Sequence, residues 1–244
     1  MSQLELALEA EISARHLSFV ETGRAQPSRD MIVHLAETLA VPLRERNAIL
    51  LAAGFAPLYA ERPLDDPALS AARAAVDAVL QNCAPFPALA VDRRWNIVAF
   101  NAGVAAFLDG VAPKLLAAPN AMRLALHPQA LAPRIENFGE WRGHLLARVR
   151  QQIAASGDAG LEDLLSELLG YSYPDSADLT SHAHDANNDA AIVVPLRLRD
   201  GATRLSFIST ITVFGTPVDV TLSELAIETF FPADARTSDF LRAK

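Results

Sequence analysis

Two groups of side chains in this sequence have types and spacings that suit molecular recognition. The first lies near the N-terminus, where the exposed face of a predicted short helix carries Ala14, Arg15, His16, Ser18 and Phe19. An arginine fork can bind the edge of a guanine or a phosphate group, and an aromatic ring can touch a thymine methyl group. This face therefore has the chemistry of a surface that reads a nucleic acid.

The second group consists of large apolar side chains spread over the last 150 residues, which are candidates for the lining of an apolar pocket. Arg123, His127 and Arg142 could hold a carboxylate head group there, because a guanidinium binds carboxylates through two parallel hydrogen bonds. Ordinary core packing and structural salt bridges are the alternative roles. The candidate lining residues are Trp95, Phe100, Phe107, Trp141, Leu145, Phe207, Ile211 and Phe230.

Other chemistry finds little support. His182, His184, Asp185 and Asp189 stand in a polar, Asn-rich stretch, which favours a solvated loop over a metal site. The single cysteine, Cys83, excludes a disulfide framework and suits an inert thiol. Gly-x-Ser-x-Gly, Walker A, Gly-x-Gly-x-x-Gly and His-Glu-x-x-His motifs do not occur. We expect neither an enzyme nor a bound cofactor or metal.

Composition sets limits on location and partners. The chain has 244 residues, of which 51% are hydrophobic, and a formal net charge of −8. Any nucleic-acid binding must therefore come from a local basic face. No run approaches the ~20 apolar residues that a membrane span needs, and the N-terminus does not resemble a signal peptide. We expect a cytoplasmic protein that does not interact with membranes.

Residues 1–54 predict four short helices. Ser2 and Glu5 form a capping box, Ser13 caps a helix over residues 14–22, and Ser28 caps one over residues 29–40. A fourth helix covers residues 43–53. Small and apolar side chains of the first helix should pack against those of the second.

The rest of the chain predicts an α+β domain. A helix over residues 68–82 precedes two strands at 87–92 and 95–100. Helices follow at 102–108, 138–155 and 161–169, and three strands close the chain at 191–199, 203–214 and 222–230. We expect a five-stranded antiparallel sheet with helices on one face and a ligand pocket between them.

The stretch from Ser2 to Ser28, with its Glu21-Thr22-Gly23-Arg24 ending, resembles the helix-turn-helix of the XRE (Cro/cI-type) family of transcription regulators. The resemblance implies that the second helix enters the major groove of double-stranded DNA. Ser13, Ala14, His16 and Ser18 would then face the bases, Arg15 would bind guanine and Phe19 a thymine methyl. Gln3, Arg24 and Arg29 would contact phosphates.

Three features depart from this pattern. The family's domain usually has five helices, and the first would precede Ser2, so we expect it to be missing or encoded upstream. Glu11 stands in the turn where the family typically has glycine. Residues 1–60 hold five basic and seven acidic side chains. We therefore expect weak or conditional DNA binding; the alternative is a truncated protein that binds ligand and dimerises.

The stretches 86–101, 119–128 and 214–234 resemble the MmyB-like ligand-binding domain, a PAS-like module. The resemblance implies that residues 1–60 form a DNA-binding domain. It also implies that residues 61–244 form a sensor of a small apolar, fatty-acid-like ligand. Our hypothesis is a homodimer in which ligand entry shifts the helix at 68–82 and the preceding linker. That shift would alter the spacing of the two recognition helices.

Overall fold

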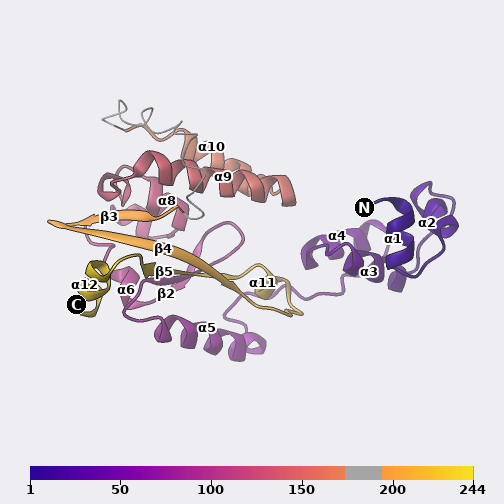
Figure 1. Ribbon diagram of the computed structural model, residues 1–244. Coiled ribbons are helices and arrows are strands. Elements are labelled where there is room, and N and C mark those ends of the chain that lie inside the picture. The colour runs from indigo at the N-terminus through magenta and orange to yellow at the C-terminus, as the bar shows by residue number, and fades with distance from the viewer. Residues whose placement is uncertain (174–193, 244) are drawn as a thin grey trace. The chain divides into compact units, whose positions relative to one another are not determined.

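The chain passes between two compact units three times, after residues 70, 213 and 224 (Figure 1). The computed structural model describes residues 1–173 and 194–243. One unit consists of Met1–Ser70 together with Phe214–Glu224, and the other of Ala71–Val213 and Leu225–Lys244. A segment near the C-terminus therefore belongs to the N-terminal unit.

The first unit contains four helices: α1 (Gln3–Glu9), α2 (Ala14–Glu21), α3 (Arg29–Thr38) and α4 (Leu43–Ala52). The three predicted N-caps are confirmed, since the hydroxyls of Ser2, Ser13 and Ser28 each accept a hydrogen bond from the backbone N–H three residues later. The carboxylate of Glu5 completes the capping box, and its hydrogen bonds from Ser2 lower its pKa. The buried apolar side chains of these helices are Ala7, Leu17, Ile32, Ala36, Leu43 and Leu50.

All four helices end in the same way. The residue after each C-cap has a positive φ, and its N–H and the next one bond back to carbonyls near the helix end. Gly23 and Gly54 adopt this conformation freely, but Glu11 and Ala40 adopt it with φ of 50°. A side chain with a Cβ costs about 1 kcal/mol in this region, so two of the four helix ends are strained.

The second unit contains one five-stranded antiparallel sheet, as predicted, in the order β2-β1-β5-β4-β3. The turn at Asp200-Gly201 joins the last two strands of this order as a hairpin. The strands are β1 (Ala88–Val91), β2 (Ile97–Phe100), β3 (Leu196–Asp200), β4 (Thr203–Val213) and β5 (Ala226–Pro232).

Helices lie on both faces of the sheet rather than on one (Figure 1). α8 (Ala121–Leu126), α9 (Phe138–Ser156) and α10 (Ala159–Leu169) cover one face, over the main hydrophobic core. α5 (Ser70–Asn82) lies on the opposite side. The thiol of Cys83, just after α5, lies 3.5 Å from the hydroxyl of Thr229 in β5. Thr229 stands between two residues that line the pocket on the other face of the sheet, so this contact places the end of α5 on the opposite face. Short helical segments fill the connections: α6 (Ala102–Ala105), α7 (Pro113–Leu116), η1 (Pro67–Leu69) and η2 (Ala132–Arg134).

Two predicted elements are corrected, and one helix is added. The helix expected at 102–108 ends at Ala105. The strand expected at 222–230 begins at Ala226, because Asp219 caps the short helix α11 (Val220–Ser223) through the N–H of Thr221. The C-terminal helix α12 (Ala235–Ala243) was not predicted. No helix within residues 1–173 and 194–243 is both long and apolar enough to cross a membrane.

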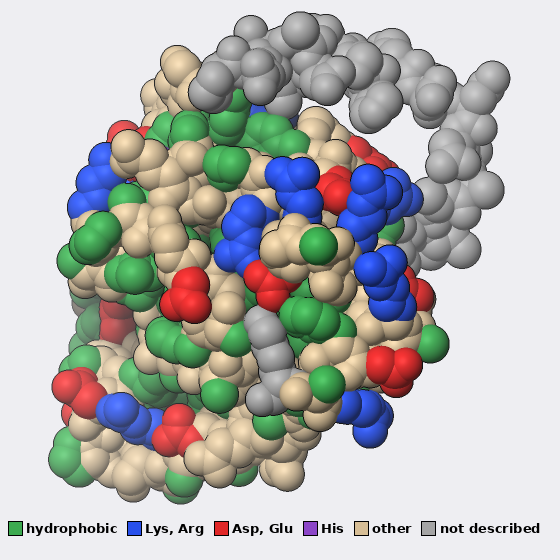
Figure 2. Space-filling view, turned by 90° about the vertical axis from the view of Figure 1, so that its left-hand side faces the viewer, with side chains coloured by type: hydrophobic (Ala, Val, Ile, Leu, Met, Phe, Trp, Pro, Cys, Tyr) green, Lys and Arg blue, Asp and Glu red, His purple; other side chains and the backbone are tan. Residues whose placement is uncertain are grey.

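The β3–β4 hairpin carries charged side chains of both signs (Figure 2). Arg134 pairs with Asp200 at 3.0 Å, and Arg204 with Glu136 at 3.0 Å. These arginines have acidic partners, so this face is not a continuous basic surface.

The strained helix ends predict a stabilising substitution. We expect Glu11→Gly to increase the local free energy of unfolding of α1 and α2 by about 1 kcal/mol, because glycine adopts a positive φ without steric cost. Hydrogen-exchange mass spectrometry of peptides covering residues 3–21 measures this change. Glu9→Gly is the matched control and should destabilise by about 1 kcal/mol, since it places glycine inside a helix. Equal protection in the two variants would refute the strain at Glu11.

Candidate DNA-reading helix and ligand pocket

The surface of α2 presents the side chains that sequence reasoning selected. Arg15 and His16 are exposed, and Ala14, Ser18 and Phe19 are partly exposed. The guanidinium carbon of Arg15 lies 5.4 Å from the centre of the Phe19 ring, one helical turn away. This cation–π contact holds the arginine on the outer face of the helix.

Basic side chains flank this helix without acidic partners. Arg24 and Arg29 are exposed, and within the described part of the chain neither they nor Arg15 form an ion pair. Gln3 differs, because its amide donates a hydrogen bond to the carboxylate of Glu21. That bond fastens the start of α1 to the end of α2, so Gln3 must exchange partners before it can bind a phosphate.

Contacts behind α2 fix its position. Leu17 is buried, and His34 of α3 bonds through its ring Nε2 to the carbonyl of Ala10 at 2.9 Å. His34 thereby links α3 to the turn between α1 and α2. The helix pair is thus held from the side opposite to Arg15.

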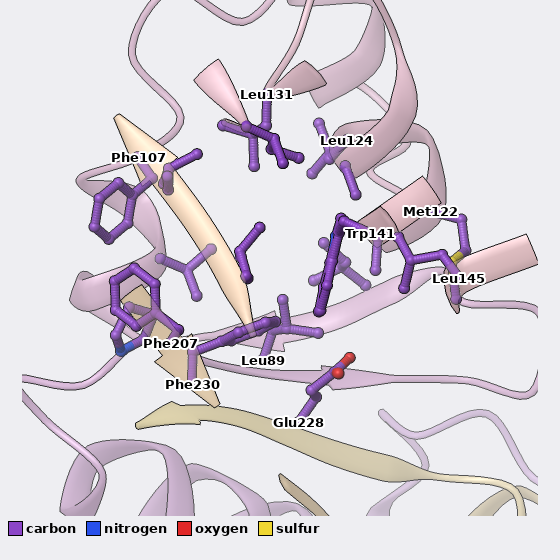
Figure 3. A pocket seen from close by; sticks show the side chains of 18 of the residues that line it. Leu89, Phe107, Met122, Leu124, Leu131, Trp141, Leu145, Phe207, Glu228 and Phe230 are labelled. Carbon is purple, nitrogen blue, oxygen red and sulfur yellow. The ribbon is translucent and has the colours of Figure 1, made fainter. Parts of the chain in front are cut away.

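In the second unit, a cavity of about 100 Å³ lies between the sheet and helices α8 and α9 (Figure 3). A site for one water needs ~10–15 Å³, so the cavity has room for a ligand of on the order of ten non-hydrogen atoms. Its wall is almost wholly apolar; Glu228 is the charged residue among those that line it. Six predicted residues belong to the lining: Trp95, Phe107, Trp141, Leu145, Phe207 and Phe230.

The edge of the pocket at Trp95 depends on a strained turn. Trp95 has a φ of 67°, and its backbone carbonyl accepts a hydrogen bond from Ala121. The amide of Asn120, which is buried, donates to the carbonyl of Arg94 and to the side chain of Asn96. The Trp95 indole N–H donates to Gln152 of α9 at 2.7 Å. These bonds set the ring against the core.

A comparison with protein families identifies both parts of the chain. The model of the MmyB-like transcription regulator ligand binding domain matches residues 72–243, and that of a helix-turn-helix matches residues 1–46. The chain belongs to the MmyB-like transcription regulators. A search of curated proteins finds no significant match.

In this MmyB-like domain, one face of α9 carries polar side chains beside the pocket. Arg148 donates to the buried carboxylate of Glu228 at 3.1 Å, and its guanidinium carbon lies 4.5 Å from the centre of the Trp95 ring. His144 packs against Trp141, with ring centres 5.5 Å apart. Burial lowers the pKa of His144, and the charge of Arg148 lowers it further.

Several predicted pocket residues lie outside the lining. Phe100 and Ile211 are 44% and 50% exposed. Arg123 pairs with Glu167 of α10 at 2.7 Å, which raises the pKa of the guanidinium. His127 accepts a hydrogen bond from the N–H of Gln129, and Arg142 lies beside Tyr173. None of the three basic side chains is placed to bind a head group inside this cavity.

Sequence reasoning missed Glu228, although a carboxylate within the apolar run Ala226–Phe231 was a usable signal. It also missed lining residues from the helical connections, whose place depends on the fold: Met122, Leu124, Ala125, Leu131 and Ile135. The residues His182, His184, Asp185 and Asp189 lie outside the described part of the chain. Within that part, no group of three His, Cys, Asp or Glu side chains could hold a metal ion.

The buried ion pair predicts a large effect on stability. Arg148 and Glu228 have side chains that are 18% and 6% exposed. We expect Arg148→Met to lower the free energy of unfolding by about 3–5 kcal/mol, because it leaves a buried carboxylate without its partner. Denaturant unfolding followed by circular dichroism measures the change. The double variant Arg148→Met/Glu228→Gln should recover most of the loss, and no recovery would contradict this assignment.

Proposed function

We propose that this MmyB-like regulator binds double-stranded DNA as a homodimer and responds to a small apolar molecule in the pocket between the sheet and α9. The supporting observation is the apolar lining of the cavity, which favours a ligand with a hydrocarbon body. The fatty-acid-like ligand expected from the resemblance has such a body. Residues 1–60 would serve DNA binding and residues 61–244 ligand binding, in the cytoplasm, where a regulator meets both.

We assign sequence reading to α2. Its exposed Arg15 can reach a guanine, and Ser13, Ala14, His16, Ser18 and Phe19 lie on or beside the same face. Arg24 and Arg29, together with Gln3 once it leaves Glu21, supply phosphate contacts that position the helix. Two such helices about 34 Å apart would read successive turns of the DNA.

The link between sensing and DNA binding is the segment Phe214–Glu224, which joins β4 to β5 and packs within the helical unit. Arg44 of α4 binds Glu224 of this segment at 2.6 Å and Glu61 of the linker at 2.5 Å. Arg62 binds Asp219, and the N–H of Val220 donates to the carbonyl of Ala60. Within the helical unit, Arg44 thus holds both the linker and the segment Phe214–Glu224.

The decisive experiment is fluorescence anisotropy of the full chain with an operator selected from random DNA, titrated against salt with and without ligand. We expect binding that weakens as salt rises, with a slope of about 0.9 for each phosphate contact, and an affinity that changes with ligand. No binding at low salt would favour the alternative, a ligand-binding and dimerising protein.

Two arginines should separate reading from positioning. Arg15→Ala should lower affinity for the selected operator about 10- to 100-fold, the discrimination of one bidentate base contact, and affect random DNA much less. Arg24→Ala is the control and should weaken binding to all sequences while flattening the salt dependence. Anisotropy with both DNAs measures these effects. If Arg15→Ala lowered the affinity for both DNAs equally, Arg15 of α2 would not contact the bases.

The two carboxylates on Arg44 test the route of coupling. We expect Glu224→Ala to remove at least half of the coupling free energy between ligand and DNA, which is typically about 1–3 kcal/mol. Glu61→Ala removes the same kind of bond from the linker and should leave most of the coupling. DNA affinity is measured with and without octan-1-ol or octanoate, whichever binds more tightly. If Glu61→Ala removes more of the coupling free energy than Glu224→Ala, the coupling runs through the linker and the helix at 68–82 instead.

A further inference from the structure

The longest strand of the sheet has a free edge along its second half, because β4 extends beyond β3 (Figure 1). β3 pairs with residues 203–207 of β4, and β5 pairs with residues 207–213 on the other side. Within residues 1–173 and 194–243, no strand pairs with residues 208–213 on the side of β3. We call residues 208–213 the open β4 edge.

Alternate residues of the open β4 edge direct their backbone groups away from β5. In an antiparallel ladder, successive residues point their N–H and C=O groups to opposite sides of the strand. Ser206 points toward β5, since its carbonyl accepts a hydrogen bond from Ala233, which follows β5. The register with β5 has no bulge, so Ser209, Ile211 and Val213 point the other way. No hydrogen bond from the rest of the described chain reaches their N–H and C=O groups.

The side chains of the open β4 edge also favour pairing with another strand. Thr210, Ile211, Thr212 and Val213 are all exposed, and their β-branched side chains are typical of strands. Natural sheets usually protect such an edge with charged side chains, proline or a bulge, and residues 208–213 contain none of these. The whole chain has a formal net charge of −8, so an uncharged strand is a place where two copies can meet without repulsion.

A second copy of the same strand satisfies every free group of this edge when a twofold axis passes through Ile211. In that register the two Ile211 residues oppose each other, and Ser209 of each copy opposes Val213 of the other. Each of these pairs exchanges both N–H···O bonds. Thr210 then lies opposite Thr212, and threonine pairs across strands are favourable. A shift of the axis by one residue leaves Ser209 or Val213 without a partner.

The position of β3 agrees with the length of this pairing. β4 ends at Val213, which in the proposed register lies opposite Ser209 of the other copy. The first paired residue of β3 lies opposite Phe207, two positions further along β4. The incoming strand therefore ends before β3 begins, and it continues the line of β3 without overlap.

We propose that two copies of this chain join through their open β4 edges and form one continuous antiparallel sheet with a twofold axis at Ile211. The pairing occupies the free edge of both copies, so the assembly closes at two. This inference rests on the homodimer of the proposed function and names its interface. One pair of short strands is small beside the ~800 Å² that each partner buries in a standard interface, so we expect a dimer that dissociates on dilution.

Sedimentation velocity of the full chain over a range of concentrations tests the interface. Ile211→Lys places two ammonium groups opposite each other and should raise the dimer dissociation constant at least about tenfold. Val98→Lys is the matched control, because Val98 is 42% exposed on β2, the strand at the other edge of the sheet. It should change the constant less than about twofold. Thermal unfolding followed by circular dichroism verifies that both variants fold.

Cysteine pairs test the register in a Cys83→Ala background. Thr210 and Thr212 of opposite copies form a pair without mutual hydrogen bonds, in which the Cα atoms lie about 4.5 Å apart, within the range that a disulfide bridges. A mixture of Thr210→Cys and Thr212→Cys proteins should form the intermolecular disulfide at least about fivefold faster than either variant alone. Each variant alone is the control, because its cysteine faces a threonine.

The outcomes separate this interface from the function on which it rests. If the chain sediments as a monomer at every concentration, both the interface and the homodimer fail, while anisotropy still decides whether the chain binds DNA and ligand. If the dimer survives Ile211→Lys, or if Val98→Lys dissociates it instead, the homodimer stands and the open β4 edge is not its interface. If the single cysteine variants cross-link alone as fast as the mixture, the axis does not pass through Ile211.

Discussion

β4 and β5 pair along seven registered positions, from Val213 opposite Ala226 to Phe207 opposite Pro232. Phe207 on one strand and Glu228 and Phe230 on the other line the pocket. The same two strands lead into the segment Phe214–Glu224, which belongs to the helical unit. A continuous antiparallel ladder resists independent sliding of its strands, because any slip breaks its hydrogen bonds and reverses the faces of its side chains. The pocket wall and the connection to the DNA-binding helices are therefore parts of one element.

The electrostatics of the pocket depend on Arg148. A charge that leaves water must be paired, and Glu228 is nearly fully buried. Arg148 neutralises it and at the same time lies over the Trp95 ring. Residues 141, 145, 148 and 152 share one face of α9 at helical spacing. A single helix face thus contributes apolar wall residues together with a cation and an amide that bind the lining residues Glu228 and Trp95, and the register of α9 sets the position of all of them.

The parts of the fold that depend on local interactions were predictable from the sequence. Serine caps, the Asp200-Gly201 hairpin and the alternating strands need only neighbouring residues. The extent of the pocket, in contrast, could not be predicted from local sequence. Phe100 pairs with Leu89 and Ile211 pairs with Glu228, so both stand in register with lining residues.

Their exposure shows that these rows of the sheet extend beyond the cover of the helices. Alternation predicts the face of a side chain but not whether a helix covers it. α11 was missed for a related reason: Val218, Val220 and Leu222 alternate like a strand. The capping bond from Thr221 to Asp219 nevertheless makes the segment helical.

The distance along the chain between Glu224 and Glu228 bears on how a ligand could act on DNA binding. Glu224 binds Arg44 in the helical unit, and Glu228 lies in the pocket four residues later. Leu225 between them is buried and anchors the start of β5 in the core. A ligand can shift an equilibrium only by its differential affinity for two states. Under the proposed function, a differential affinity at Glu228 would act on β5, and Glu224, the partner of Arg44, lies two residues before that strand begins. In the proposed mechanism no separate signalling helix is needed, because the strand that lines the pocket begins next to the contact with Arg44.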